Sequence, residues 1–113
     1  MSRVFIVQDQ LSRDQRTGET RRRFPQVDTL QPLGDIVYVI DQRVNSFDTA
    51  KAQEDIRDRL EDITEDDYIV LIGTTLLCSL ALAYASHMLD GNVRILQWST
   101  RESKYLEMNL RTF

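Results

Sequence analysis

Few residues in this chain have types and spacing that could do chemistry, and the clearest group is Gly73-Thr74-Thr75. These residues follow an apolar run at 68–72 and open a helix-like segment at 74–89. A glycine at the carboxyl end of a parallel strand allows a tight turn, and the next helix offers free N–H groups and a positive dipole end to an anion. The turn therefore predicts a site for a small ligand or nucleotide. Since the phosphate-loop and dinucleotide patterns are both absent, the alternative that Thr74 only caps the helix stays open.

A second candidate is the basic segment Arg21-Arg22-Arg23 with Phe24, which could bind a partner or phosphate groups. Residues 12–23 hold five arginines against two acidic residues, a local balance of +3. Long polar loops in a compact domain often carry interactions, and we expect residues 11–24 to form a mobile loop. Nucleic acid is disfavoured as the partner, because three adjacent arginines are a small footprint and the acidic remainder repels a polyanion. It is kept as an alternative.

The other reactive side chains have no partners in the sequence. His87 is the only histidine and Cys78 the only cysteine, which leaves no set of ligands for zinc and no Cys/His pair for nucleophilic catalysis. The acidic run at 65–67 lacks the spaced ligands of a calcium loop and is typical of a solvated connection. We therefore expect no catalytic residues, no metal and no cofactor, and we do not expect an enzyme.

Length and composition predict one domain over residues 1–113. The chain has 42% hydrophobic and 28% charged residues, with a net charge of -4. Residues 47–67 carry nine acidic against three basic side chains, which predicts an acidic face. A single cysteine fits a reducing compartment, and neither a signal peptide nor a membrane span is expected from the pattern. The expected location is the cytoplasm.

The alternation of apolar runs and turn residues predicts an α/β fold. Five segments have the pattern of strands, and they are residues 4–7, 35–40, 68–72, 93–98 and 104–110. Between them the sequence predicts an amphipathic helix after Asp48 and a more deeply buried, apolar helix at 74–89. A turn or short helix is expected at 27–33.

These elements predict a small three-layer Rossmann-like or flavodoxin-like sandwich. Its sheet would have about five strands, which are mostly parallel. The first three apolar runs would be buried, and an antiparallel C-terminal strand would form an edge. Trp98 and Tyr105 would face each other across the last hairpin. Charged and polar residues on the last strand, such as Lys104, Glu107 and Arg111, suit an edge protected against aggregation.

Several segments also resemble a known group of sequences. The strand entry Asp66-Asp67-Tyr68 with its apolar run to Gly73, the small-residue helix at 80–85 and the strand at 91–98 resemble short uncharacterised proteins encoded by tailed bacteriophages. The opening at 3–9 is similar to theirs as well. In that group the strand glycine is often followed by Asp or Asn and then Pro, where this chain has Thr74-Thr75. The resemblance implies helix capping at this point, and it implies no activity and no catalytic residues.

The sequence thus favours a phage accessory protein that is not an enzyme and acts through protein–protein contacts, either by self-association or by binding a host or phage factor. The missing catalytic set, the acidic face and the exposed edge strand indicate this function. A small-ligand or nucleotide-binding module at 73–75 and a nucleic-acid-associated protein acting through Arg21 to Arg23 are the alternatives. The expected location becomes the cytoplasm of the host cell.

Overall fold

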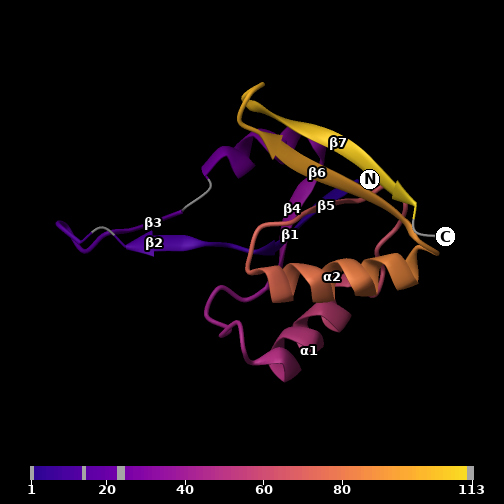
Figure 1. Ribbon diagram of the computed structural model, residues 1–113, viewed down its shortest axis with the longest axis horizontal. Coiled ribbons are helices and arrows are strands. Elements are labelled where there is room, and N and C mark those ends of the chain that lie inside the picture. Colours follow the sequence, from indigo (N-terminus) through magenta and orange to yellow (C-terminus); the bar gives the residue numbers. More distant parts are fainter. Residues whose placement is uncertain (1, 14, 23–24, 112–113) are drawn as a thin grey trace.

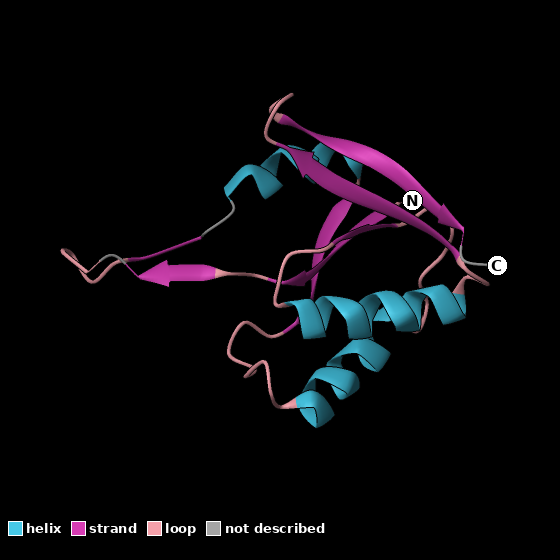
Figure 2. Ribbon diagram, in the orientation of Figure 1, coloured by secondary structure: helices cyan, strands magenta, loops and turns pink. Residues whose placement is uncertain are grey.

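The computed structural model describes residues 2–13, 15–22 and 25–111 and is built around one mixed sheet (Figures 1 and 2). The sheet has the strand order β4-β1-β5-β6-β7. Its parallel strands are β1 (Arg3–Gln8), β4 (Asp35–Ile40), β5 (Tyr68–Val70) and β6 (Asn92–Ser99), and β7 (Lys104–Arg111) runs antiparallel beside β6. The predicted α/β fold with an antiparallel C-terminal edge is confirmed. The four parallel strands have the order of the flavodoxin-like doubly wound folds.

The connections between parallel strands lie on both faces of this sheet. The step from β1 to β4 runs one way along the sheet, and the steps to β5 and then β6 run the other way. Right-handed crossovers therefore place the first connection on the opposite face from the next two. Helices α1 (Thr49–Leu60) and α2 (Thr75–Met88) accordingly lie together on one face, and the 3₁₀ helix η1 (Pro25–Leu33) lies on the other (Figure 1). We call these the helix face and the open face.

Alternate residues of the central strands supply a core on each face. Phe5 and Val7 of β1 pack on the helix face with residues from α1 and α2. Val4 and Ile6 point to the open face, where Val27 of η1 covers them in part. All four β1 residues are at most 1% exposed, as two-sided burial of this strand predicts.

Two strands differ from the expectation. The strand at 35–40 was expected to be buried, but β4 is an edge strand in which only Val39 and Ile40 are buried. The strand expected at 68–72 ends at Val70, because the amide of Ile72 turns back and donates to the Val70 carbonyl at 2.9 Å. Its three remaining residues are buried, so the predicted two-sided burial of this strand is confirmed.

Both helices begin where the sequence predicts. The carboxylate of Asp48 accepts a hydrogen bond from the Lys51 amide at 3.2 Å and caps α1. Helix α2 contacts β1, β6 and α1, whereas α1 contacts β4 and α2, which agrees with the expectation that α2 is the more deeply buried helix. Leu76 and Met88 of α2 nevertheless stay 42% and 39% exposed. The reason is that α2 has a helical neighbour on one side only, so part of its apolar surface stays uncovered.

A two-stranded hairpin replaces much of the expected loop at 11–24. Strands β2 (Leu11–Arg13) and β3 (Thr20–Arg22) pair antiparallel, with Ser12 opposite Arg21. The hairpin projects from the side of the main sheet (Figure 1). The local alternation was too short to indicate these strands, because three-residue strands leave no periodic signal in the sequence.

Candidate functional site

The turn after β5 has the backbone that the sequence predicts. Gly73 adopts a φ of 143°, a conformation that side-chain-bearing residues rarely take. A Cβ atom built there would also lie 3.5 Å from the Cys78 Sγ and 3.6 Å from the Gln8 Cβ. Glycine is thus required here for backbone conformation, and this requirement would hold with or without a ligand.

Thr74 is used by the fold as a helix cap. Its hydroxyl oxygen accepts a hydrogen bond from the Leu77 amide at 3.4 Å, and its carbonyl accepts one from the Cys78 amide at 3.0 Å. Thr75 is the exposed first residue of α2, and its carbonyl accepts a bond from the Ser79 hydroxyl. Capping by Thr74 is confirmed, and anion binding at this turn stays a prediction.

A hollow of about 430 Å³ lies beside the turn, at the carboxyl ends of β5 and β6. Of the three predicted ligand residues, only Gly73 lines it. Its other walls include Val70, Trp98 and Tyr105, which belong to the open face, whereas α2 lies on the helix face. The helix N-terminus and the hollow therefore do not share the arrangement that a phosphate site between strand and helix needs.

The predicted cross-strand aromatic pair forms one wall of this hollow. Trp98 and Tyr105 are register partners with ring centroids 5.1 Å apart and planes at 70°. The Tyr105 hydroxyl is buried and finds no hydrogen-bond partner among the described residues. Burial, together with nearby Tyr38, raises the pKa of Tyr105, so this phenol stays neutral at physiological pH. The pair is a packing feature of the open face.

The second predicted site is only partly described. Arg21 and Arg22 lie in β3 of the projecting hairpin, while Arg23 and Phe24 fall outside the described residues. The hairpin carries Arg21 and Arg22 away from the Gly73 turn, so the described part of this site lies apart from that turn (Figure 1). Partner or nucleic-acid binding by this segment stays a prediction.

The acidic connection at 65–67 is not simply solvated, and Asp67 explains why. Its side chain is 1% exposed and accepts hydrogen bonds from the Arg3 and Thr64 amides, each at 2.8 Å. The Arg3 guanidinium adds an ion pair at 3.0 Å. Burial would raise the pKa of Asp67, but the Thr64 amide and Arg3 outweigh it and lower the pKa. The prediction of a solvated connection is confirmed at Glu65 and Asp66, which are exposed, and it is wrong at Asp67, because the distant partner Arg3 leaves no local signal.

The acidic surface is also placed differently from the expectation. Helix α1 carries three acidic and three basic residues, so it has no net charge. The connection at 61–67 holds five of the acidic residues and no basic one, and Arg3 neutralises part of it through Asp62 and Asp67. The negative charge therefore gathers at the amino end of the sheet instead of along the helix.

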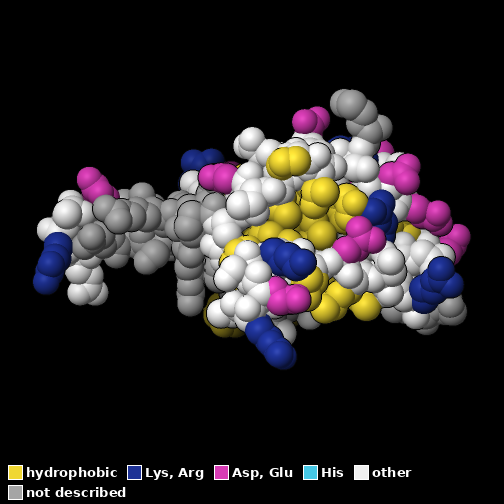
Figure 3. Space-filling model, turned by 90° about the horizontal axis from the view of Figure 1, so that it is seen from above, with side chains coloured by type: hydrophobic (Ala, Val, Ile, Leu, Met, Phe, Trp, Pro, Cys, Tyr) yellow, Lys and Arg dark blue, Asp and Glu magenta, His cyan; other side chains and the backbone are white. Residues whose placement is uncertain are grey.

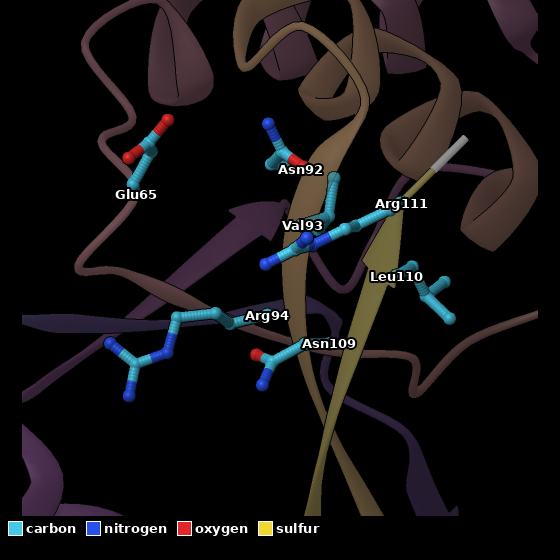
Figure 4. Close-up of a pocket in the computed structure, with 7 residues that line it drawn as sticks. All are labelled: Glu65, Asn92, Val93, Arg94, Asn109, Leu110 and Arg111. Atoms are coloured by element: carbon cyan, nitrogen blue, oxygen red, sulfur yellow. The ribbon is translucent and has the colours of Figure 1, made fainter. Parts of the chain in front are cut away.

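A polar hollow of about 420 Å³ lies at this amino end, where β6 begins and β7 ends (Figure 4). Arg94 and Arg111 line it, and two cations in a hollow could suggest an anion site. Arg94 is already engaged, however, because its guanidinium pairs with Glu107 at 3.0 Å and lies 4.1 Å over the Tyr68 ring. Its bond to Glu107 raises the pKa of Arg94 further. The residue holds β5, β6 and β7 together.

Neither the single histidine nor the single cysteine lines these two hollows. Cys78 is half-buried in α2, and burial raises the pKa of its thiol, which keeps it protonated. His87 is exposed in the last turn of the same helix. Within residues 2–13, 15–22 and 25–111, no three His, Cys, Asp or Glu side chains come together as a metal site.

The two edges of the sheet differ in how far they are covered, a difference that the sequence did not predict. At β4, Arg59 of α1 donates to the Tyr38 and Val39 carbonyls, each at 3.0 Å, and so covers part of the edge. At the other end, β7 has extensive contact only with β6 among the described elements. Half of its backbone N–H and C=O groups therefore point away from the sheet.

Strand β7 also presents different chemistry on its two faces. Glu107, Asn109 and Arg111 lie on the open face, as partners of Leu96, Arg94 and Asn92. Leu106, Met108 and Leu110 form an apolar row on the helix face, beside Ile95 and Val93. Met108 is 46% exposed. The polar residues noted in the sequence thus protect only one face, and the alternation at 106, 108 and 110 was the available signal for the other.

Comparison with known proteins identifies the family. The chain belongs to the phage Pam3 gp32-like protein family, whose model matches residues 2–112. The phage origin that the sequence resemblance implies is thereby confirmed. No curated protein and no solved structure matches the chain. In the described part of the chain, no helix is both long enough and apolar enough to cross a membrane.

Proposed function

We propose that this phage protein is a non-enzymatic accessory protein that acts through protein–protein contacts made at the β7 edge. The observation that carries the proposal is the uncovered edge itself, which is eight residues long. An extended segment of a partner can pair with such an edge, where main-chain hydrogen bonds give affinity and side chains give specificity. Action in the host-cell cytoplasm, where Cys78 would stay reduced, fits this function.

The side chains around the edge support a contact surface. Met108 and Leu106 present apolar area next to the free backbone groups, and a strand added there would cover them. A separate apolar area lies on the open face, where Figure 3 shows hydrophobic side chains gathered over the middle of the sheet. Half-buried apolar residues on that face include Ile36, Tyr38, Ile72 and Tyr105.

The ionisable groups support the non-enzymatic part of the proposal. Asp67 and Arg94 would be the natural candidates for acid–base or anion chemistry, and both are committed to bonds that hold strands together. The protonated Cys78 thiol is a poor nucleophile.

Affinity capture from phage-infected cells tests the proposal with two variants. Met108→Lys places a charge in the middle of the edge, whereas Phe47→Lys makes the same change at a side chain that is 89% exposed in the loop before α1. Proteins that the wild-type chain and Phe47→Lys retain, as identified by mass spectrometry, should be lost with Met108→Lys. Equal retention by all three chains would contradict a contact at β7.

A small-ligand module at the Gly73 turn is the second candidate, favoured by the hollow of about 430 Å³ beside it. A nucleotide bound only to the folded state at 100 times its dissociation constant would add about 2.7 kcal/mol of stability. Thr74→Asp keeps the cap but repels an anion. We expect no rise in melting temperature with common nucleotides, and a rise abolished by Thr74→Asp would promote this candidate over the first.

A further inference from the structure

We propose that the occupant of the β7 edge is a second copy of this chain, paired antiparallel about a two-fold axis through Met108. The inference rests on the proposed function and names its partner. The dimer would join two five-stranded sheets into one sheet of ten strands, with both helix layers on the same side. The backbone geometry and the side chains of β7 determine this register.

The geometry of an antiparallel pair limits the registers that a two-fold axis allows. Residues directly opposite each other in an antiparallel pair lie on the same face, and side chains alternate between faces along a strand. A two-fold axis between two β7 strands must therefore place one residue opposite its own copy. With Lys104–Arg111 as the strand, the registers with substantial overlap are those centred on residues 106 to 109.

Opposed charges and the length of the overlap decide among these registers. A centre at Glu107 sets two carboxylates directly opposite each other, which is destabilising. A centre at Leu106 runs the partner strand into the turn at 100–103, and a centre at Asn109 leaves only residues 107–111 paired. A centre at Met108 pairs residues 105–111, the longest overlap without opposed like charges.

The side chains of the two strands fit one another in the Met108 register. On the helix face, Met108 meets its own copy and Leu106 meets Leu110 of the second copy, so the apolar row is covered along its length. On the open face, Glu107 meets Asn109, whose amide can donate to the carboxylate. Glu107 keeps its ion pair with Arg94 of its own chain at 3.0 Å, and this register sets no second carboxylate opposite it. The strand is therefore complementary to itself in both polarity and charge.

Charge over the whole molecule does not oppose this arrangement. The chain carries a net charge of -4, but β7 itself holds two basic residues and one acidic residue. Two copies thus approach through the part of each molecule where the negative balance is reversed.

Sedimentation velocity of the full chain, over about 1 to 100 µM, tests the inference. We expect the wild type and Phe47→Lys to dimerise, and Met108→Lys to have an at least tenfold higher dissociation constant, because two lysines would meet on the axis. Met108 is already 46% exposed, so the variant should keep the wild-type circular dichroism and melting temperature. A monomeric wild type, or a dimer unaffected by Met108→Lys, would overturn the inference.

Cysteine cross-linking tests the register without relying on the Met108→Lys variant. In a Cys78→Ala background, Met108→Cys should form an intermolecular disulfide under copper phenanthroline, because position 108 faces itself across the axis. Asn109→Cys alone should form little, since position 109 faces position 107. Efficient cross-linking at 109 and not at 108 would show that the register is wrong.

These outcomes separate the two proposals. A monomeric wild type that still loses captured proteins on Met108→Lys would refute self-pairing and leave the edge contact standing. A monomer whose captured proteins are insensitive to Met108→Lys would refute both.

Discussion

At the scale of single residues, the fold depends on a few long-range polar contacts that the sequence could not show. Asp67 joins the start of β1 to the connection before β5, although it is 64 positions away from Arg3. It is adjacent to Glu65 and Asp66 in the sequence, and nothing in the local pattern distinguishes it from them. Local contacts were easier to predict. The cap at Thr74 depends on a residue three positions ahead and is confirmed, and Asp48 caps α1 over the same spacing.

The pKa of Asp67 gives this contact a pH dependence. Because the pKa is lowered in the folded state, its contribution to stability is present above the unfolded value of about 3.9 and is lost as pH falls through the lower folded value. We expect Asp67→Asn to reduce the free energy of unfolding by about 2 kcal/mol at pH 7, since buried donors lose a charged acceptor. The variant should also lose less stability than the wild type below about pH 4.

Urea unfolding at pH 7 and pH 3 measures both effects, and Asp62→Asn is the matched control. Asp62 pairs with the same Arg3, but its side chain is 70% exposed, so its removal should cost less than about 0.5 kcal/mol at pH 7. Equal losses from the two variants would show that burial of Asp67 does not matter.

At the scale of elements, the apolar runs predicted which segments form the sheet but not how far each is buried. The pattern at 68–72 indicated a two-sided core strand, and the short β5 is buried on both faces. The pattern at 35–40 is similarly apolar after Asp35, yet β4 is an edge. Burial of an apolar strand depends on its place in the strand order, which the local sequence does not specify.

The candidate sites show the same division between local and non-local information. The Gly73 turn and its helix were predictable because glycine, cap and helix are consecutive. The β7 edge was foreseen as exposed, and the alternation at 106, 108 and 110 signals its apolar row, but whether that row lies on the helix face depends on which side of the sheet the helices occupy. That choice follows from crossover handedness and strand order together, so it became clear only in the fold.

At the scale of the whole molecule, the structure is asymmetric in a way that favours association. One edge of the sheet is partly covered by Arg59 of α1, and the other is open along β7. The helix face has two α-helices, and among the described residues the open face is covered by the nine-residue η1 alone. A free edge of this length is a liability in a monomer, and pairing it with another strand removes that liability.

Hydrogen exchange of the β7 amides at two protein concentrations tests the edge pairing most directly. Amides that bond to β6 should be protected at every concentration, whereas the alternate amides of residues 105–111 should exchange freely when dilute and become protected when concentrated. Met108→Lys should abolish only the concentration-dependent protection. Alternate β7 amides that exchange at the same fast rate at about 1 µM and about 100 µM would contradict pairing of this edge with a second copy.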